Sequence, residues 1–154
     1  MCACRNWETQ KNWYTNVLKQ GSFELSDFDM MGVSFYPFYS ASAGLESLRT
    51  SLKNMASNWN KEVAVVETNW PTSCPNPKYQ FPSDVRSIPF SEAGQVQYVT
   101  KVADVVKSVN RGVGLFYWEP AWIHNAGLGS SCAENTMFAY PGQARSSLSV
   151  FRSI

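Results

Sequence analysis

The sequence predicts an α/β fold with a parallel sheet and, within that class, a portion of a (β/α)8 TIM barrel. Three continuous apolar runs are typical of buried parallel strands, which do not alternate between apolar and polar residues. Helical patterns separate the runs, and strands that alternate with helices form parallel sheets with right-handed crossovers. Long segments, 68–90 and 120–142, follow the second and third runs, as expected where a barrel builds a site at its strand ends. A complete barrel needs at least about 200 residues, so a chain of 154 residues predicts only a part of one.

The expected strands cover residues 28–36, 63–67 and 113–118. The first run ends before a proline and the third ends before a Glu-Pro pair, whereas the second leads directly into Glu67. Each run is therefore followed by a residue type that ends a strand or begins a site.

Apolar residues at helical spacing predict three helices and a helical tail. The first helix covers residues 9–19 and ends before a glycine, and the second has Ser42 as its N-cap. The third follows Ser91 and stops before Gly112, and a final helix is expected within residues 144–154. The apolar positions are Leu45, Leu48, Leu52 and Met55 in the second helix, and Val96, Val99, Ala103, Val106 and Val109 in the third.

Composition and missing motifs narrow the function. No Gly-rich phosphate loop follows any of the runs, which disfavours a doubly wound nucleotide-binding sheet. The formal net charge is +1 with both signs interspersed, so neither a nucleic-acid binder nor a basic membrane patch is indicated. No apolar run approaches the length that spans a bilayer. Residues 1–6 lack the apolar stretch of a secretory signal, so we expect no export signal in them.

The four cysteines form two groups. Cys74 and Cys132 lie in loops rich in Pro, Gly and Ser, which suits a disulfide in an oxidising compartment. Cys2 and Cys4 lie at the N-terminus, and we expect them to be unpaired. His124 is the single histidine, so we expect it to be a surface residue and expect no metal site.

A carboxylate and several tryptophans lie at the ends of the runs. Glu67 follows four apolar residues, and a buried strand of this kind can fix a carboxylate in the mouth of a barrel, as glycosidases require. A capping or ion-paired glutamate is the alternative, and the spacing leaves both open. Trp70, Trp118 and Trp122 lie beside Pro, Asn or Glu, where a flat aromatic face suits stacking on a sugar ring. Packing in the core is the more ordinary role of tryptophan.

Three longer motifs resemble the endo-β-1,4-galactanases of glycoside hydrolase family 53, and fungal members most. Residues 65–77 (VVETNWP, then SCPNP) resemble the region of strand seven. Residues 28–39 (FDMMGVSFYPFY) resemble strand six, and residues 112–122 (GVGLFYWEPAW) resemble strand eight. Residues 127–132 are similar to the loop that follows strand eight. The resemblance runs from about Trp7 to the C-terminus, so it covers only the C-terminal half of the family's barrel.

The resemblance implies roles for individual residues. Glu67 occupies the position of the catalytic nucleophile. Tyr36 matches a tyrosine that hydrogen-bonds the nucleophile in related barrels, and Trp118 matches a tryptophan that forms the floor of the sugar subsite beside the scissile bond. Weaker candidates for substrate binding are Trp70, Trp122 and Glu119.

The resemblance also implies a wider context. Residues 7–154 are expected to be the C-terminal portion of a catalytic barrel, roughly strands six to eight, behind an unmatched stub at residues 1–6. The implied substrate is galactan or arabinogalactan of pectin, hydrolysed with retention of configuration and without a cofactor. The family implies a secreted protein whose full-length parent is a monomer, with no nucleic-acid or membrane partner.

One departure from the family concerns the acid/base residue. Family members carry it in an Asn-Glu pair at the end of strand four, and this sequence contains no Asn-Glu dipeptide. The chain by itself is therefore expected to be inactive, and a truncated or sugar-binding remnant is one alternative. Another is a different retaining barrel hydrolase, such as a mannanase or an arabinosidase. The Thr-Asn-Trp-Pro continuation after Glu67 argues against that second alternative.

Overall fold

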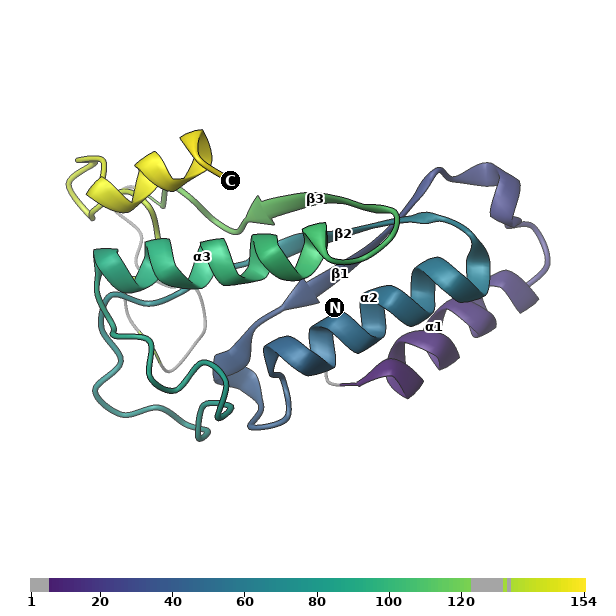
Figure 1. The fold of residues 1–154 in the computed structure, drawn as a ribbon, viewed down its shortest axis with the longest axis horizontal. Helices are drawn as coiled ribbons and strands as arrows, with labels where there is room; N and C mark the ends of the chain where they lie inside the picture. Colours follow the sequence, from purple (N-terminus) through teal and green to yellow (C-terminus); the bar gives the residue numbers. More distant parts are fainter. Residues whose placement is uncertain (1–5, 123–131, 133) are drawn as a thin grey trace.

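Parallel strands alternate with α-helices in the residues that the structure, a computed structural model, describes, namely 6–122, 132 and 134–154 (Figure 1). The α-helices are α1 (Trp7–Lys19), α2 (Leu45–Trp59) and α3 (Glu92–Lys107). The strands are β1 (Met30–Phe35), β2 (Glu62–Thr68) and β3 (Gly112–Tyr117). The short 3-10 helices are η1 (Leu25–Asp27), η2 (Pro37–Tyr39) and η3 (Ser146–Arg152).

The sheet has β2 between β1 and β3, and both pairings are parallel. The α/β class and the parallel order predicted from the sequence are confirmed, with strand ends shifted by one or two residues. One helix lies in each connection, α2 between β1 and β2 and α3 between β2 and β3. Because the carboxyl ends of parallel strands meet at one edge, the residues that follow the three strands gather at the same end of the sheet.

The caps of the first and third helices follow from short polar side chains. The Asn6 side chain accepts a hydrogen bond from the Thr9 N–H at 2.9 Å, so α1 begins two residues earlier than expected. Ser91 accepts from the Gly94 N–H at 3.0 Å and caps α3, as predicted. The C-terminal tail forms the 3-10 helix η3 rather than an α-helix.

The prediction of Ser42 as the N-cap of α2 is wrong, because Gly44 occupies that position. The acceptor comes from a distant loop, where a carboxylate oxygen of Asp84 accepts from the Glu46 N–H at 3.2 Å. A Cβ atom at Gly44 would lie 2.7 Å from a carboxylate oxygen of Asp84, so the glycine leaves the room that this carboxylate needs. A cap supplied by tertiary contact cannot be recognised in the local sequence.

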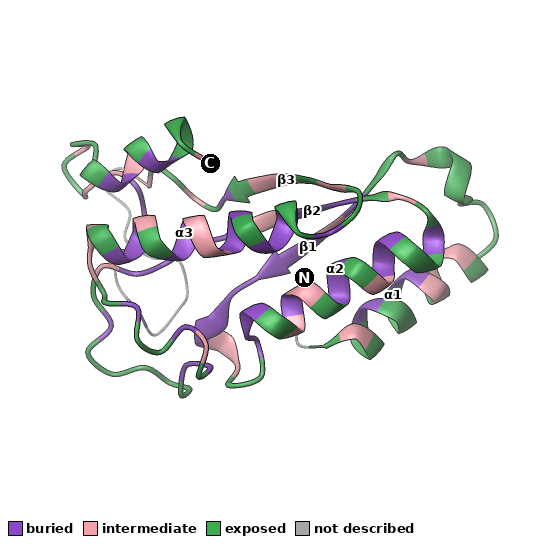
Figure 2. Cartoon of the chain, viewed as in Figure 1, coloured by how far each residue is buried: buried purple, intermediate pink, exposed green. Residues whose placement is uncertain are grey.

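One face of the sheet, the covered face, packs against α2 and α3, and α1 packs against α2 (Figures 1 and 2). Alternate strand residues point into this layer and are almost fully buried. They are Met31, Val33 and Phe35 of β1, and Val63 and Val65 of β2. They share one apolar cluster with the helix positions predicted from the sequence, including Leu48, Leu52, Met55 and Val99. The covered face therefore forms the hydrophobic core of the described residues.

The opposite face of the sheet, the uncovered face, has small residues at its centre. A Cβ atom at Gly114 would lie 3.6 Å from the Ala64 Cβ, and one at Gly32 would lie 2.7 Å from a methyl group of Val66. Phe116, further along β3 on this face, is 56% exposed. Inward-facing residues alternate with outward-facing ones along barrel strands, so the uncovered face is the inner side expected of a barrel wall.

Candidate active site

β2 contains an irregularity shortly before its carboxyl end. Val65 pairs in regular register with β1, but the next β1 residue, Ser34, pairs with Glu67. Val66 is therefore an extra residue, a β-bulge. Without this bulge, strict alternation from the buried Val65 would put Glu67 on the covered face. The bulge instead places Glu67 on the uncovered face and returns Thr68 to the covered face.

Tyr36 and Glu67 meet at the carboxyl ends of β1 and β2. The Tyr36 hydroxyl donates a hydrogen bond to Glu67 Oε2 at 3.1 Å. Tyr36 is only 6% exposed, and its burial, followed by the charge of Glu67, raises the pKa of Tyr36 well above its ordinary value. The hydroxyl therefore stays protonated and fixes the orientation of the Glu67 carboxylate.

Trp118 directly follows β3 at the same end of the sheet. The backbone N–H of Trp118 donates to the Thr68 carbonyl at 2.9 Å, which extends the pairing of β2 with β3. Tyr117 is buried on the covered face, so alternation places the Trp118 indole on the uncovered face, together with Glu67. The indole is 41% exposed and presents an aromatic surface beside the strand that carries the carboxylate.

Two residues that the sequence did not single out connect these positions. The Thr68 hydroxyl donates to the Phe35 carbonyl at 2.7 Å, and the Asn69 side-chain amide donates to the Trp118 carbonyl at 2.6 Å. Both residues are buried, Thr68 at 0% and Asn69 at 2% exposure. The sequence offered a single indication that Thr68 and Asn69 belong to the site, namely their place directly after Glu67.

The other candidates for substrate contact lie further from the strand ends. Trp70 is completely buried. Its indole N–H donates to the Pro89 carbonyl at 2.9 Å, and its ring stacks on Tyr98 at 4.7 Å between centroids. These contacts are those of core packing, the alternative that the sequence left open for Trp70, and its contact with a substrate stays a prediction. Glu119 and Trp122 are half-buried in the segment that leaves β3, and their contact with a substrate stays a prediction.

The loops that leave β2 and β3 are joined by a covalent bond. Cys74 and Cys132 form the disulfide that the sequence predicted, with 4.3 Å between their Cα atoms. The other two cysteines, Cys2 and Cys4, and the single histidine, His124, lie outside the described residues. The disulfide links the segment that follows Glu67 at the end of β2 with the segment that follows Trp118 beyond β3.

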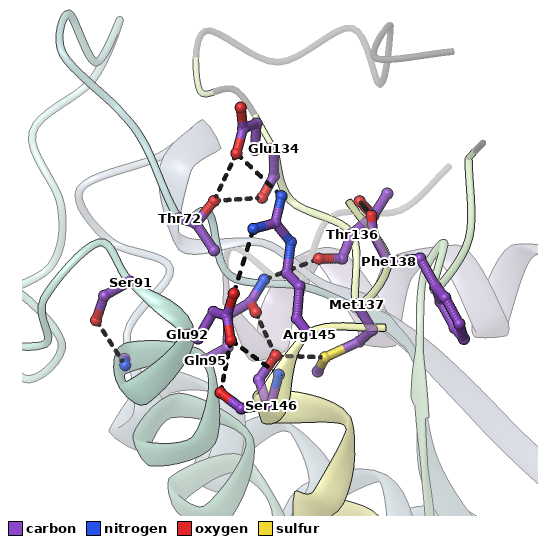
Figure 3. A network of polar contacts seen from close by, with 12 residues as sticks. Thr72, Ser91, Glu92, Gln95, Glu134, Thr136, Met137, Phe138, Arg145 and Ser146 are labelled. Atoms are coloured by element: carbon purple, nitrogen blue, oxygen red, sulfur yellow. Dashed lines mark hydrogen bonds and ion pairs between the residues drawn. The ribbon is translucent and has the colours of Figure 1, made fainter. Parts of the chain in front are cut away.

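A polar network attaches the C-terminal segment to the start of α3 (Figure 3). Arg145 forms ion pairs with Glu134 at 2.9 Å and with Glu92 at 3.6 Å. Glu92 also accepts from the N–H and the hydroxyl of Ser146, at 2.8 and 2.5 Å. These bonds, and then the charge of Arg145, lower the pKa of Glu92 below its ordinary value. The buried Gln95 donates to a backbone carbonyl of the same segment at 3.1 Å, so the segment is held on the side of α3.

The chemistry available at the strand ends is that of a fixed carboxylate, a tyrosine hydroxyl and an indole face. Within residues 6–122, 132 and 134–154, no group of three or more His, Cys, Asp or Glu side chains could hold a metal ion. None of the helices within these residues has the length and apolar character needed to cross a membrane.

Known proteins resemble this chain over nearly its whole length. The sequence profile of glycosyl hydrolase family 53 matches residues 2–151. The arabinogalactan endo-beta-1,4-galactanase of Humicola insolens is 76% identical over 149 residues, and that of Thermothelomyces thermophilus is 73% identical. Each match covers 97% of this chain and 45% of the relative. The chain thus spans a little under half the length of these relatives.

Solved structures agree with the sequence comparison. A structure from work on two fungal beta-1,4-galactanases superposes with a TM-score of 0.93 at 75% identity, covering 98% of this chain and 46% of that one. The GH53 catalytic domain of Ignisphaera aggregans superposes with a TM-score of 0.70, covering 96% of this chain and 44% of that one. Its 21% identity shows the fold alone. The expectation that the chain forms part of a larger TIM barrel is confirmed.

Proposed function

The chain belongs to glycosyl hydrolase family 53, and on this premise we propose that it forms the nucleophile-bearing part of a retaining endo-β-1,4-galactanase. The observation that carries the proposal is the hydrogen bond from Tyr36 to Glu67 at the carboxyl ends of two neighbouring strands. Active sites of TIM-barrel enzymes lie at this end of the strands. A buried tyrosine that holds a carboxylate there is suited to orienting a nucleophile.

In the proposed reaction, a Glu67 carboxylate oxygen attacks the anomeric carbon of a galactose unit. The bond from that carbon to the glycosidic oxygen breaks, and a second carboxylic acid protonates the leaving oxygen. The same second group, now a carboxylate, removes a proton from water, which hydrolyses the glycosyl ester at Glu67 and restores both groups. The indole of Trp118 supports the sugar ring, and Tyr36 keeps the attacking oxygen in place.

We propose that the second carboxylate comes from the part of the family's barrel that lies outside these 154 residues. The sequence contains no Asn-Glu pair, and the chain spans 45% of its curated relatives. Retention requires the two carboxyl groups about 5–5.5 Å apart, which a strand on the opposite side of a barrel mouth can provide.

The test uses a completed barrel, in which these 154 residues follow the part of the Humicola insolens relative that precedes its matched region. We expect it to release galacto-oligosaccharides from linear galactan. Glu67→Gln should lower kcat by about 10³-fold or more, because it removes the nucleophile and keeps its shape. The control is Glu62→Gln, at the exposed start of the same strand, which should leave kcat unchanged. If the Glu67 variant kept more than about a tenth of the activity, the loss would be under about 1.4 kcal/mol of transition-state stabilisation and the nucleophile assignment would be wrong.

A polypeptide of these 154 residues by themselves should not cleave galactan. Without a positioned acid, the attack would have to expel a poor alkoxide leaving group, and acid–base help is typically worth about 10²–10⁴-fold. A reducing-sugar assay on linear galactan checks this expectation. Product release above the level of the Glu67→Gln variant would show that the described strands already hold an acid/base group.

Substrate class and location are part of the proposal. The Thr-Asn-Trp-Pro sequence after Glu67 supports galactan over mannan or arabinan, and the completed barrel should prefer linear galactan in a panel of the three. Faster hydrolysis of mannan or arabinan than of galactan would favour a different retaining glycosidase. The disulfide between Cys74 and Cys132 supports an extracellular enzyme, since such bonds persist in oxidising compartments.

A further inference from the structure

The residue directly after Glu67 bonds to the strand on one side. The Thr68 hydroxyl donates to the carbonyl of Phe35, the residue before Tyr36, at 2.7 Å. The Tyr98 hydroxyl lies 2.7 Å from the same Thr68 oxygen. The Thr68 hydroxyl has a single proton, which it gives to the Phe35 carbonyl, so Tyr98 is the donor in the bond between the two hydroxyls. The hydroxyl of Thr68 therefore holds the end of β1 against β2.

The second residue after Glu67 bonds to the strand on the other side. The Asn69 amide nitrogen donates to the carbonyl of Trp118 at 2.6 Å. Its amide oxygen accepts from the side chain of Asn135 at 2.9 Å, which fixes which end of the amide faces Trp118. Asn135 is itself held, because its carbonyl accepts from the Tyr117 hydroxyl. The Asn69 amide therefore holds the end of β3 against β2.

We propose that Thr68 and Asn69 are positioning residues that set the nucleophile against its two neighbours, Thr68 toward Tyr36 and Asn69 toward Trp118. This inference rests on the proposed function of Glu67. Neither residue is a catalytic residue, since both side chains are buried and bonded to protein atoms.

The sheet needs these bonds because its regular ladder is interrupted at the same place. The register shifts between β1 and β2 at Val66, and between β2 and β3 in the interval from Val65 to Thr68. A bulge leaves ladder positions unpaired and lets the strand bend. Side-chain bonds to the carbonyls of Phe35 and Trp118 restore the attachment just beyond the irregular step, where the catalytic geometry is set.

The two residues should affect different kinetic constants. Loss of the Thr68 hydroxyl frees the end of β1 and so loosens the Tyr36 contact that orients Glu67, which is needed in the chemical step. In the completed barrel, Thr68→Val should lower kcat about tenfold with KM changed less than about twofold. Loss of the Asn69 amide frees the backbone that carries the Trp118 indole, which supports the sugar. Asn69→Ala should raise KM about tenfold with a smaller change in kcat.

The experiment measures kcat and KM on linear galactan for both variants, and then galactotetraose binding by calorimetry with Glu67→Gln also present. Asn69→Ala should weaken this binding and Thr68→Val should not. Thr68→Ser keeps the hydroxyl and should restore kcat to within about twofold of the parent. Leu52→Ala is the control for a purely structural change, because it opens a cavity under α2 without touching a strand end. It should lower stability and leave kcat and KM unchanged below the unfolding temperature.

The results separate this inference from the proposed function. If Glu67→Gln abolishes activity but Thr68→Val and Asn69→Ala behave like Leu52→Ala, the positioning roles are wrong and the nucleophile stands. If Glu67→Gln remains active, the proposed function itself fails. Should Thr68→Val not fold, Thr68→Ala removes the same hydroxyl, and with it the bond to the Phe35 carbonyl, and should lower kcat in the same direction. An unchanged kcat for that variant would overturn the role of Thr68. Should Asn69→Ala not fold, Asn69→Leu keeps a side chain of similar size, removes the donor to the Trp118 carbonyl and should raise KM, and an unchanged KM would overturn the role of Asn69.

Discussion

The two faces of the sheet have the same strands and opposite surroundings. On the covered face, Val63 and Val65 are completely buried beneath the helices. On the uncovered face, Phe116 is 56% exposed and Trp118 is 41% exposed. Figure 2 shows a second difference, between the central strand β2, whose residues are mostly buried, and the edge strand β3, whose residues are mostly half-buried or exposed.

The two faces are therefore expected to serve different purposes, one the stability of the fold and the other the proposed catalysis. The covered face packs against α2 and α3 within the described residues. The uncovered face carries Glu67 and its neighbours, and it needs further strands to enclose them. A side chain on the first face is expected to affect folding, and one on the second to affect catalysis and the joining of the two halves of the barrel.

The largest expected effect concerns the oligomeric state: a polypeptide of these 154 residues alone should self-associate, unlike the completed barrel. The outer edges of β1 and β3 present backbone groups that can pair with other chains, and the uncovered face between them exposes the aromatic side chains of Phe116 and Trp118. We expect self-association by size-exclusion chromatography with light scattering, whereas the completed barrel should be a monomer. Phe116→Glu should reduce the association. A monodisperse monomer of the 154 residues would break the comparison, because it would mean that the uncovered face needs no partner.

Removing the disulfide should give the next largest effect. Cys74 and Cys132 are 58 positions apart, and the loss of such a cross-link costs about 4 kcal/mol in the chain-entropy model. The double variant Cys74→Ser with Cys132→Ser should therefore unfold at lower urea concentration in the completed barrel. Its kcat should stay close to that of the parent at a temperature where it is folded. A large fall in kcat without a fall in stability would place the disulfide among the residues that set the site.

A matched pair of core substitutions sharpens the comparison of the faces. Leu52 is fully buried beneath the covered face, so Leu52→Ala should lower the free energy of unfolding by about 3 kcal/mol. In the completed barrel Phe116 should be just as buried, and Phe116→Ala should cost about 3 kcal/mol as well. Urea unfolding measures both. A cost below about 1 kcal/mol for Phe116→Ala would show that the rest of the barrel leaves the uncovered face open.

The smallest expected effect is a pH dependence at the start of α3. Hydrogen bonds from Ser146, and then Arg145, lower the pKa of Glu92 below its ordinary value of 4.5. A lowered folded-state pKa means that the stabilisation is complete above the unfolded-state pKa and is lost as the pH falls through the folded-state pKa. Glu92→Gln should therefore lose less stability than the parent between about pH 5 and pH 3. The control is Glu8→Gln, an exposed residue of α1, which should follow the parent, and identical slopes for all three would contradict the prediction.

Much of the fold follows from the sequence, because its elements are locally encoded. Continuous apolar runs predicted β1, β2 and β3, and the helical spacing of residues such as Leu48 and Leu52 predicted α2. Ser91 was recognisable as a cap because its hydroxyl oxygen accepts from the N–H of Gly94, only three residues away. The pairing of Cys74 with Cys132 followed from two loops at the same end of adjacent strands.

The remainder depends on contacts between distant residues. Asp84 caps a helix 38 residues away, which hid the N-cap role of Gly44. Trp70 could not be assigned to the core or to the substrate, because a tryptophan beside a proline suits both. The roles of Thr68 and Asn69 arise from partners on other strands, so no spacing within the sequence could reveal them.

The extra residue at Val66 matters for anyone who would transplant this site into a designed scaffold. Designed sheets favour unbroken strands with matched lengths. An idealised β2 without the bulge could either keep all its residues in regular alternation or lack Val66. With every residue kept, Glu67 would turn toward Phe35 and Tyr98 and bury its charge in the apolar layer away from Tyr36, which is strongly unfavourable. With Val66 deleted, the carboxylate would face the correct side but retreat by one residue, about 3.3 Å along the strand, away from the hydroxyl that orients it. A designed copy of the site must therefore include the β-bulge at Val66 together with the active-site side chains.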